Sequence, residues 1–199
     1  MQEGDKMTTW LEKEVEVYFT PIDDPPQTVL DIGANIGAFT KKAHDLWPNA
    51  IFTCYEAMPQ LMDELNANCP FALNSNKAVL NYDGKCNIYV GDCLTTSSFY
   101  KLGRQLEYTI EIDCIAASGI LSHELVKIDT EGCETDIIMG LDLSNTRHVW
   151  LEYHLPDDKI MLTTFMQVRG FTVVKHVPDE KNSFLGTLCF TKSFTKTGH

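Results

Sequence analysis

The sequence lacks long apolar runs and paired-cysteine motifs, and each absence excludes a class of protein. No apolar stretch approaches the roughly 18 residues of a membrane-spanning helix, and the opening Met-Gln-Glu-Gly-Asp is unlike a secretory signal. The seven cysteines are odd in number and show no Cys-x-x-Cys spacing, so neither a disulfide framework nor a zinc site is predicted. We therefore expect a soluble, cytoplasmic protein in a reducing compartment, without membrane insertion.

Basic charge is also scarce. Sixteen Lys and Arg residues face 28 Asp and Glu residues, which gives a net charge of −12. No basic cluster is longer than Lys41-Lys42, so the chain has no electrostatic reason to bind a polyanion. We expect no nucleic-acid partner.

Apolar strand-like runs alternate with helix-like segments along most of the 199 residues. This pattern predicts a doubly wound, mostly parallel α/β sheet, closed by a C-terminal antiparallel hairpin. We expect a leading helix (8–18) and linker within 1–27, one folded domain over 28–192, and a tail over 193–199. The expected strands are 28–32, 51–56, one within 72–79, 87–91, 107–114, 124–129, 149–153, 171–176 and 184–191. The principal helices are expected at 38–47, 59–68, from about 131 onward, and at 157–168.

The chain is organised around a glycine-containing turn between the first expected strand and its helix. Thr28 to Thr40 reads as a buried strand, a tight turn with the spacing Asp-x-Gly-x-x-x-Gly, and a helix start. Gly33 and Gly37 permit positive φ and a close ligand approach, and Asn35 tolerates the left-handed region. The spacing fits neither the dinucleotide fingerprint nor the P-loop.

A second acidic residue strengthens the case for nucleoside binding. Glu56 ends the apolar run 51–56, about 20 residues beyond the turn, where α/β sheets place an acid that holds a ribose diol. Acids at both strand ends indicate a nucleoside site without a phosphate cradle.

Three segments resemble the FkbM family of methyltransferases. They are the run Val-Leu-Asp-Ile-Gly-Ala-Asn-Ile-Gly at 29–37, the Tyr-Glu-Ala at 55–57, and the Lys-x-Asp-x-Glu-Gly-x-Glu run at 127–134. The last run is the most specific. The resemblance implies a class I, Rossmann-like fold, S-adenosylmethionine (SAM) as methyl donor, and O-methylation of a glycan or glycoside, with a 6-deoxyhexose such as rhamnose or fucose as a reasonable acceptor.

Two sets of binding residues are predicted at the carboxyl ends of the strands. The donor site is expected to use Asp31, Gly33, Ala34, Asn35, Gly37, Glu56, Met58, Asn76 and Asp129. In the family the segment around Asn76 lies beside the adenine, and Met58 suits either the adenine face or the core. The acceptor site is expected to use Lys127 and the hydroxyl-rich loop 92–104 through Thr96, Ser97 and Ser98.

The predicted catalytic residues are His154, Asp129, Glu131 and Glu152. His154 is the expected general base, oriented by Glu152 on the same strand face, with Asp129 as the alternative base. Glu134 is expected only to complement a helix N-terminus, and a buried Lys127 is expected to pair with a carboxylate. No metal site is predicted. As an alternative, Asp129, Glu131 and Glu152 with His154 offer ligands for a divalent cation.

Other functions stay open at this point. One is O-methylation of a small molecule that is not a sugar, and another is an inactive nucleoside-binding module. The chain is also compatible with being one module of a larger glycan-assembly polypeptide.

Overall fold

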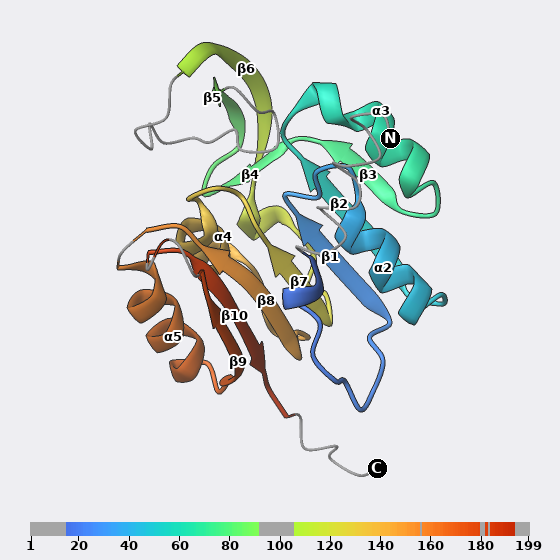
Figure 1. Cartoon of the computed structure of the whole chain (residues 1–199), viewed down its shortest axis with the longest axis vertical. Helices are drawn as coiled ribbons and strands as arrows, with labels where there is room; N and C mark the ends of the chain where they lie inside the picture. Colours follow the sequence, from blue (N-terminus) through green and yellow to red (C-terminus); the bar gives the residue numbers. More distant parts are fainter. Residues whose placement is uncertain (1–14, 92–105, 156, 180–181, 183, 194–199) are drawn as a thin grey trace.

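The computed structural model describes residues 15–91, 106–155, 157–179, 182 and 184–193. Within these residues, seven strands form one sheet in the order β3-β2-β1-β7-β8-β10-β9 (Figure 1). β10 runs antiparallel to both of its neighbours, and the other pairs are parallel. The strands are β1 (Thr28–Ile32), β2 (Ile51–Glu56), β3 (Leu73–Asn76), β7 (Leu125–Ile128), β8 (His148–Tyr153), β9 (Thr172–Pro178) and β10 (Gly186–Thr191). The predicted fold class is confirmed.

Helical segments connect the strands as the sequence pattern predicts. They are η1 (Val15–Val17), α2 (Ala38–Leu46), η2 (Pro59–Leu61), α3 (Met62–Asn68), η4 (Ala117–Gly119), α4 (Glu134–Gly140) and α5 (Asp158–Val168). The helix expected from about 131, which is α4, begins three residues later because Glu131 and Gly132 have positive φ angles of 59° and 119°. No helix among the described residues is long and apolar enough to cross a membrane.

A second, smaller sheet corrects the expectation of a single strand within 72–79. The chain turns at Lys77, whose N–H donates to the Ser75 carbonyl at 3.1 Å. It therefore leaves the main sheet after β3 and forms β4 (Ala78–Leu80) in a three-stranded sheet. The other two strands of this sheet, β5 (Gly84–Gly91) and β6 (Leu106–Ala116), are antiparallel to each other and longer than the expected 87–91 and 107–114.

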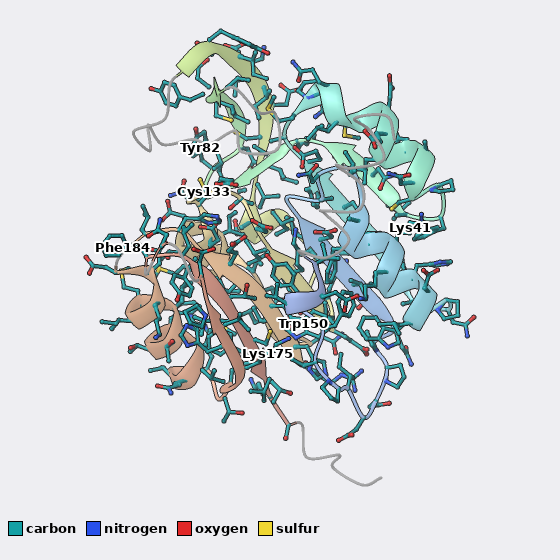
Figure 2. All side chains as sticks on the ribbon, in the orientation of Figure 1. Lys41, Tyr82, Cys133, Trp150, Lys175 and Phe184 are labelled. Carbon is teal, nitrogen blue, oxygen red and sulfur yellow. The ribbon has the colours of Figure 1, made fainter. Side chains whose placement is uncertain are left out.

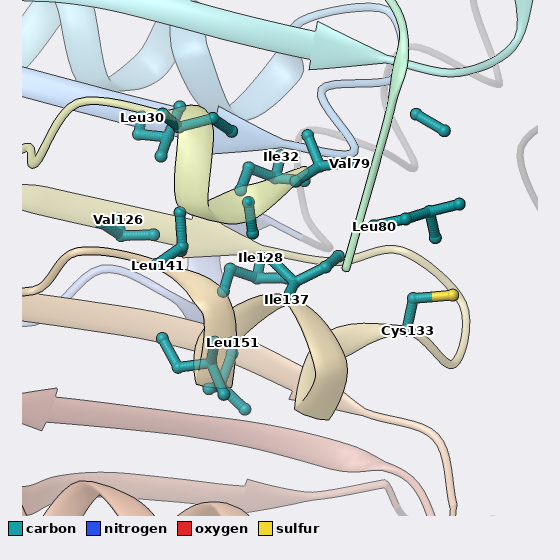
Figure 3. Close-up of a cluster of buried hydrophobic side chains, with 14 of the residues drawn as sticks. Leu30, Ile32, Val79, Leu80, Val126, Ile128, Cys133, Ile137, Leu141 and Leu151 are labelled. Carbon is teal, nitrogen blue, oxygen red and sulfur yellow. The ribbon is translucent and has the colours of Figure 1, made fainter. Parts of the chain in front are cut away.

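Side chains of alternate residues pack on opposite faces of the main sheet. Val29 of β1 packs in a cluster with Phe39 of α2, whereas Leu30 and Ile32 pack with Ile137 of α4 (Figure 3). Trp150 of β8 is fully buried in the same cluster as Val29 and Phe39 (Figure 2). We call this the α2-facing cluster; its other buried members are Val15, Tyr18, Ala43, Phe52, Leu125 and Cys189. Because successive side chains of a strand point to opposite faces, these two hydrophobic clusters lie on opposite faces of the main sheet.

The same period brings the polar strand residues to one face. Asp31, Lys127 and Glu152 each follow an apolar residue of the α2-facing cluster by two positions. Their side chains therefore lie on the α2-facing side, toward the carboxyl ends of β1, β7 and β8.

The segment before β1 packs onto this face. The leading helix expected over 8–18 falls mostly outside the described residues, and the described part forms the single 3₁₀ turn η1. Tyr18 is buried in the α2-facing cluster, and its carbonyl accepts a hydrogen bond from the Cys189 thiol of β10. Residues before 28 therefore contribute to the main core.

Candidate functional site

The turn between β1 and α2 approaches the end of β7 closely. Gly33, Asn35 and Gly37 have positive φ angles of 75°, 54° and 87°, as the sequence predicts. The N–H groups of Gly33 and Ala34 both donate to the Tyr55 carbonyl, at 2.9 and 3.0 Å. A Cβ atom on Gly33 would lie only 1.8 Å from the Asp129 carbonyl oxygen. Only glycine fits here, so the turn packs directly against the end of β7.

Glu56 fastens this turn to the end of β2. Its side-chain oxygens accept hydrogen bonds from the N–H groups of Asn35 at 2.7 Å and Met58 at 2.8 Å. The residue is 6% exposed, and burial raises the pKa of its carboxyl. Each carboxylate oxygen can accept a further bond, so the predicted contact with ribose hydroxyls stays chemically open and stays a prediction.

The residues predicted beside the adenine differ in exposure. Met58 is 3% exposed and packs in the core, as one of its two sequence interpretations expects. Asn76 is exposed, and its amide nitrogen donates to the carbonyls of Glu56 and Ala57 at 2.9 and 3.1 Å. Its amide oxygen is therefore the atom suited to an adenine amino group.

Asp31 and Lys127 form a buried ion pair beneath the turn. The Lys127 ammonium lies 3.1 Å from Asp31 Oδ1 and donates to the Gly33 carbonyl at 2.7 Å. Asp31 Oδ2 accepts a bond from the Thr40 hydroxyl at 2.7 Å. Although burial opposes the charge, Asp31 and Asp129 keep the pKa of Lys127 above its usual value. The predicted Lys127–carboxylate pair is confirmed, and its contact with an acceptor stays a prediction.

Four carboxylates surround His154 at the ends of β7 and β8. His154 Nδ1 lies 3.1 Å from Glu134 Oε1, and Nε2 lies 3.6 Å from Glu131 Oε2 and 3.8 Å from Glu152 Oε2. Asp129 belongs to the same group: one ligand atom each from Asp129, Glu152 and His154 lie within 4.8 Å of one another. We call Asp129, Glu131, Glu134, Glu152 and His154 the acid–histidine cluster. The four predicted catalytic residues thus lie together.

The carboxylate that orients His154 is Glu134, which corrects the expectation that Glu152 does so. Glu134 opens α4, is fully buried, and accepts N–H bonds from Thr130 at 2.9 Å and Gly132 at 3.0 Å. It therefore serves the helix N-terminus, as predicted, and holds the imidazole as well. The spacing of 20 residues between Glu134 and His154 gives no local signal for this contact.

Tyr18 is a second residue that the sequence did not indicate. Its hydroxyl donates to Asp129 Oδ2 at 3.0 Å and lies 3.5 Å from Glu152 Oε2. The segment before β1 thus reaches the acid–histidine cluster and steadies two of its carboxylates.

The close spacing of these groups shifts their pKa values in opposite directions. Burial and the Asp129 carboxylate raise the pKa of Glu152 well above its usual value. Burial would raise the pKa of Asp129 too, but Lys127 and His154 outweigh it and lower that pKa. Burial likewise opposes the charge of His154, yet Glu134 and the other acids raise the His154 pKa to about 10. The imidazole therefore carries a proton at neutral pH in this structure, and that proton must leave before Nε2 can accept another.

Three residues of the predicted acceptor site, Thr96, Ser97 and Ser98, lie outside the described residues. The described ends of this connection, β5 and β6, belong to the smaller sheet.

Comparisons with sequence-family models and with solved structures both find methyltransferases. The family model described as "Methyltransferase FkbM domain" matches residues 31–173 of this chain. No sequence of a curated protein matches it significantly.

Among solved structures, the ribosomal protein L11 methylase from Lactobacillus delbrueckii subsp. bulgaricus is 13% identical, with a TM-score of 0.54 over 96% of this chain and 81% of that one. The plantazolicin methyltransferase BpumL, in complex with SAH, is 10% identical with a TM-score of 0.54, covering 94% of this chain and 84% of that one. Precorrin-6y C5,15-methyltransferase from Geobacter metallireducens GS-15 is 14% identical with a TM-score of 0.51, covering 94% and 87%. These similarities show a shared methyltransferase fold.

Proposed function

The chain belongs to the FkbM methyltransferase family, and from this membership we propose that it transfers a methyl group from SAM to a hydroxyl oxygen of a sugar. The observation that carries the proposal is the meeting of two features at the end of β7. The β1–α2 turn approaches Asp129 at the end of β7, and Asp129 belongs to the acid–histidine cluster. A donor held by the turn would therefore present its methyl group near groups able to take a proton.

The donor fits the nucleoside features beside the β1–α2 turn. Glu56 suits the ribose hydroxyls, and the Asn76 amide oxygen suits the adenine amino group. The turn has no Gly-x-Gly-x-x-Gly spacing for a pyrophosphate, which favours SAM over a dinucleotide.

The proposed reaction is an in-line displacement. The acceptor oxygen attacks the methyl carbon, and the carbon–sulfur bond breaks with its electron pair returning to sulfur. SAH leaves as a neutral thioether, and the hydroxyl proton passes to the acid–histidine cluster. Because its groups are close enough to titrate together, we assign proton acceptance to the cluster as a unit.

A sugar is the proposed acceptor because the FkbM resemblance implies hydroxyl methylation of glycans or glycosides. The acid–histidine cluster offers carboxylates and an imidazole, which suit a hydroxyl-rich, uncharged molecule. The net charge of −12 argues against a nucleic-acid acceptor.

Replacing Glu56 tests the donor assignment. We expect Glu56→Ala to weaken binding of both SAM and SAH by at least about tenfold, because hydrogen bonds to a charged group contribute about 1.5–3 kcal/mol each. Calorimetric titration measures this change, and circular dichroism checks that the variant is folded. Glu64→Ala, on the exposed side of α3, is the matched control and should bind both ligands normally. Unchanged affinity in folded Glu56→Ala would refute the ribose assignment.

A further inference from the structure

His154 has the surroundings of a metal-binding histidine. Its side chain is 4% exposed, and Glu134 fixes the ring through Nδ1 at 3.1 Å. Nε2 points toward Glu131 and Glu152, but the distances of 3.6 and 3.8 Å exceed hydrogen-bonding range. Among the described residues no hydrogen bond satisfies Nε2. A histidine whose second nitrogen is held by a carboxylate is the usual arrangement for a metal ligand.

Two carboxylates complete a set of three ligands. One oxygen each from Asp129 and Glu152 lies with a His154 ring nitrogen inside a span of 4.8 Å. These residues end the adjacent strands β7 and β8, so the sheet itself fixes their backbone positions. Ligand atoms bonded at about 2.1 Å to one ion stand about 3–4 Å apart, so side-chain rotation alone can close the set around an ion.

Charge at the ends of β7 and β8 also favours a cation. Lys127 lies 3.8 Å from Asp129 but only 3.1 Å from Asp31. Lys127 therefore compensates Asp31 more than it compensates Asp129. A cation bound between Asp129 and Glu152 would offset the repulsion between these two partly buried carboxylates.

We propose that Asp129, Glu152 and His154 bind one divalent cation, of the type of Mn²⁺, at the carboxyl ends of β7 and β8. Carboxylate oxygens with a single imidazole suit a hard or borderline divalent ion that keeps open positions for water or substrate. Coordination through Nε2 would release to solvent the proton that the imidazole otherwise carries there. Tyr18, which donates to Asp129, supports the set from outside it.

The role of this ion rests on the proposed function, although its binding does not. An acceptor hydroxyl bound at an open position would have its pKa lowered by the ion and would be held beside the donor. The ion would thus position the attacking oxygen.

The test is a titration of the full chain with Mn²⁺ alone. Binding is measured as the loss of the electron paramagnetic resonance signal of the free ion. We expect one site per chain. Glu152→Gln and Asp129→Asn should each weaken binding by at least about tenfold, as is usual when the coordination shell of a metal is disturbed. Glu64→Gln on α3 makes the same chemical change at an exposed position and should bind Mn²⁺ as the unaltered chain does. If one cluster variant fails to fold, the other decides.

Two results would overturn the proposal: Mn²⁺ that remains free in the presence of the chain, or unweakened binding in a folded cluster variant. SAH affinity measured on the same samples separates this failure from that of the proposed function. A chain that binds SAH but no Mn²⁺ loses only the cation site. A chain that binds Mn²⁺ but neither SAM nor SAH keeps the cation site and loses the methyltransferase assignment.

Discussion

His154→Ala is expected to lower kcat by at least about a hundredfold while leaving the affinity for SAM and SAH nearly unchanged. The imidazole lies among four carboxylates and contacts none of the predicted ribose or adenine residues. Its removal leaves the fully buried Glu134 without its cationic partner and disorganises proton acceptance at Asp129 and Glu152. Turnover of labelled donor measures the rate, and calorimetry measures donor affinity.

His44→Ala is the matched control. His44 lies in the last turn of α2, where it stacks on Phe71, away from the acid–histidine cluster. Its removal should leave kcat near normal. If His154→Ala turns over at a near-normal rate and Asp129→Asn has lost its activity, Asp129 is the proton acceptor. If dialysis against EDTA also abolishes turnover of the unaltered chain and Mn²⁺ restores it, His154 acts through the cation.

Gly33→Ala should have a comparably large effect, on stability as well as on donor binding. The new Cβ would lie 1.8 Å from the Asp129 carbonyl oxygen, at a φ of +75° that L-residues adopt at a cost of about 1–2 kcal/mol. Crowding the backbone adds about 1–3 kcal/mol. We expect the free energy of unfolding, measured in urea, to fall by at least about 2 kcal/mol, with SAH binding lost because the turn and the end of β7 must move apart.

Gly170→Ala separates the two causes of the expected loss of stability, which are the positive φ and the clash with the backbone. Gly170 has a similar φ of +84°, but its new Cβ would meet only the flexible Lys192 side chain at 3.6 Å. It should show the conformational cost without the clash, and its SAH affinity should not change. If Gly33→Ala proves as stable and as competent to bind SAH as Gly170→Ala, the close approach of the turn to β7 has no functional importance.

Most of the main sheet could be predicted because its signals are local. Apolar runs and the glycines of the β1–α2 turn each act within a few residues. The ion pair of Lys127 was also predictable, since a lysine inside a buried strand needs a carboxylate partner. The ribose role of Glu56 stays a prediction. The exception was the start of the smaller sheet, where a turn at Lys77 divides what reads as one strand.

The interior of the site was less predictable because its contacts join distant parts of the chain. Tyr18 and Asp129 are 111 residues apart, and Glu134 and His154 are 20 apart. Neither pairing leaves a periodic or spacing signal. The shift of the His154 pKa to about 10 also depends on three-dimensional crowding, because Glu134 on α4 contributes more to it than the sequence neighbour Glu152.

The central claim is that the chain methylates a sugar hydroxyl with SAM. Its most direct test is mass spectrometry of candidate glycosides, including 6-deoxyhexosides, after incubation with the chain and methyl-labelled SAM. The account predicts a product heavier by one labelled methyl group, attached through oxygen, whose formation is lost in His154→Ala and kept in His44→Ala. Transfer of the label to a nitrogen or carbon atom, or no binding of SAM and no transfer to any glycoside, would contradict it.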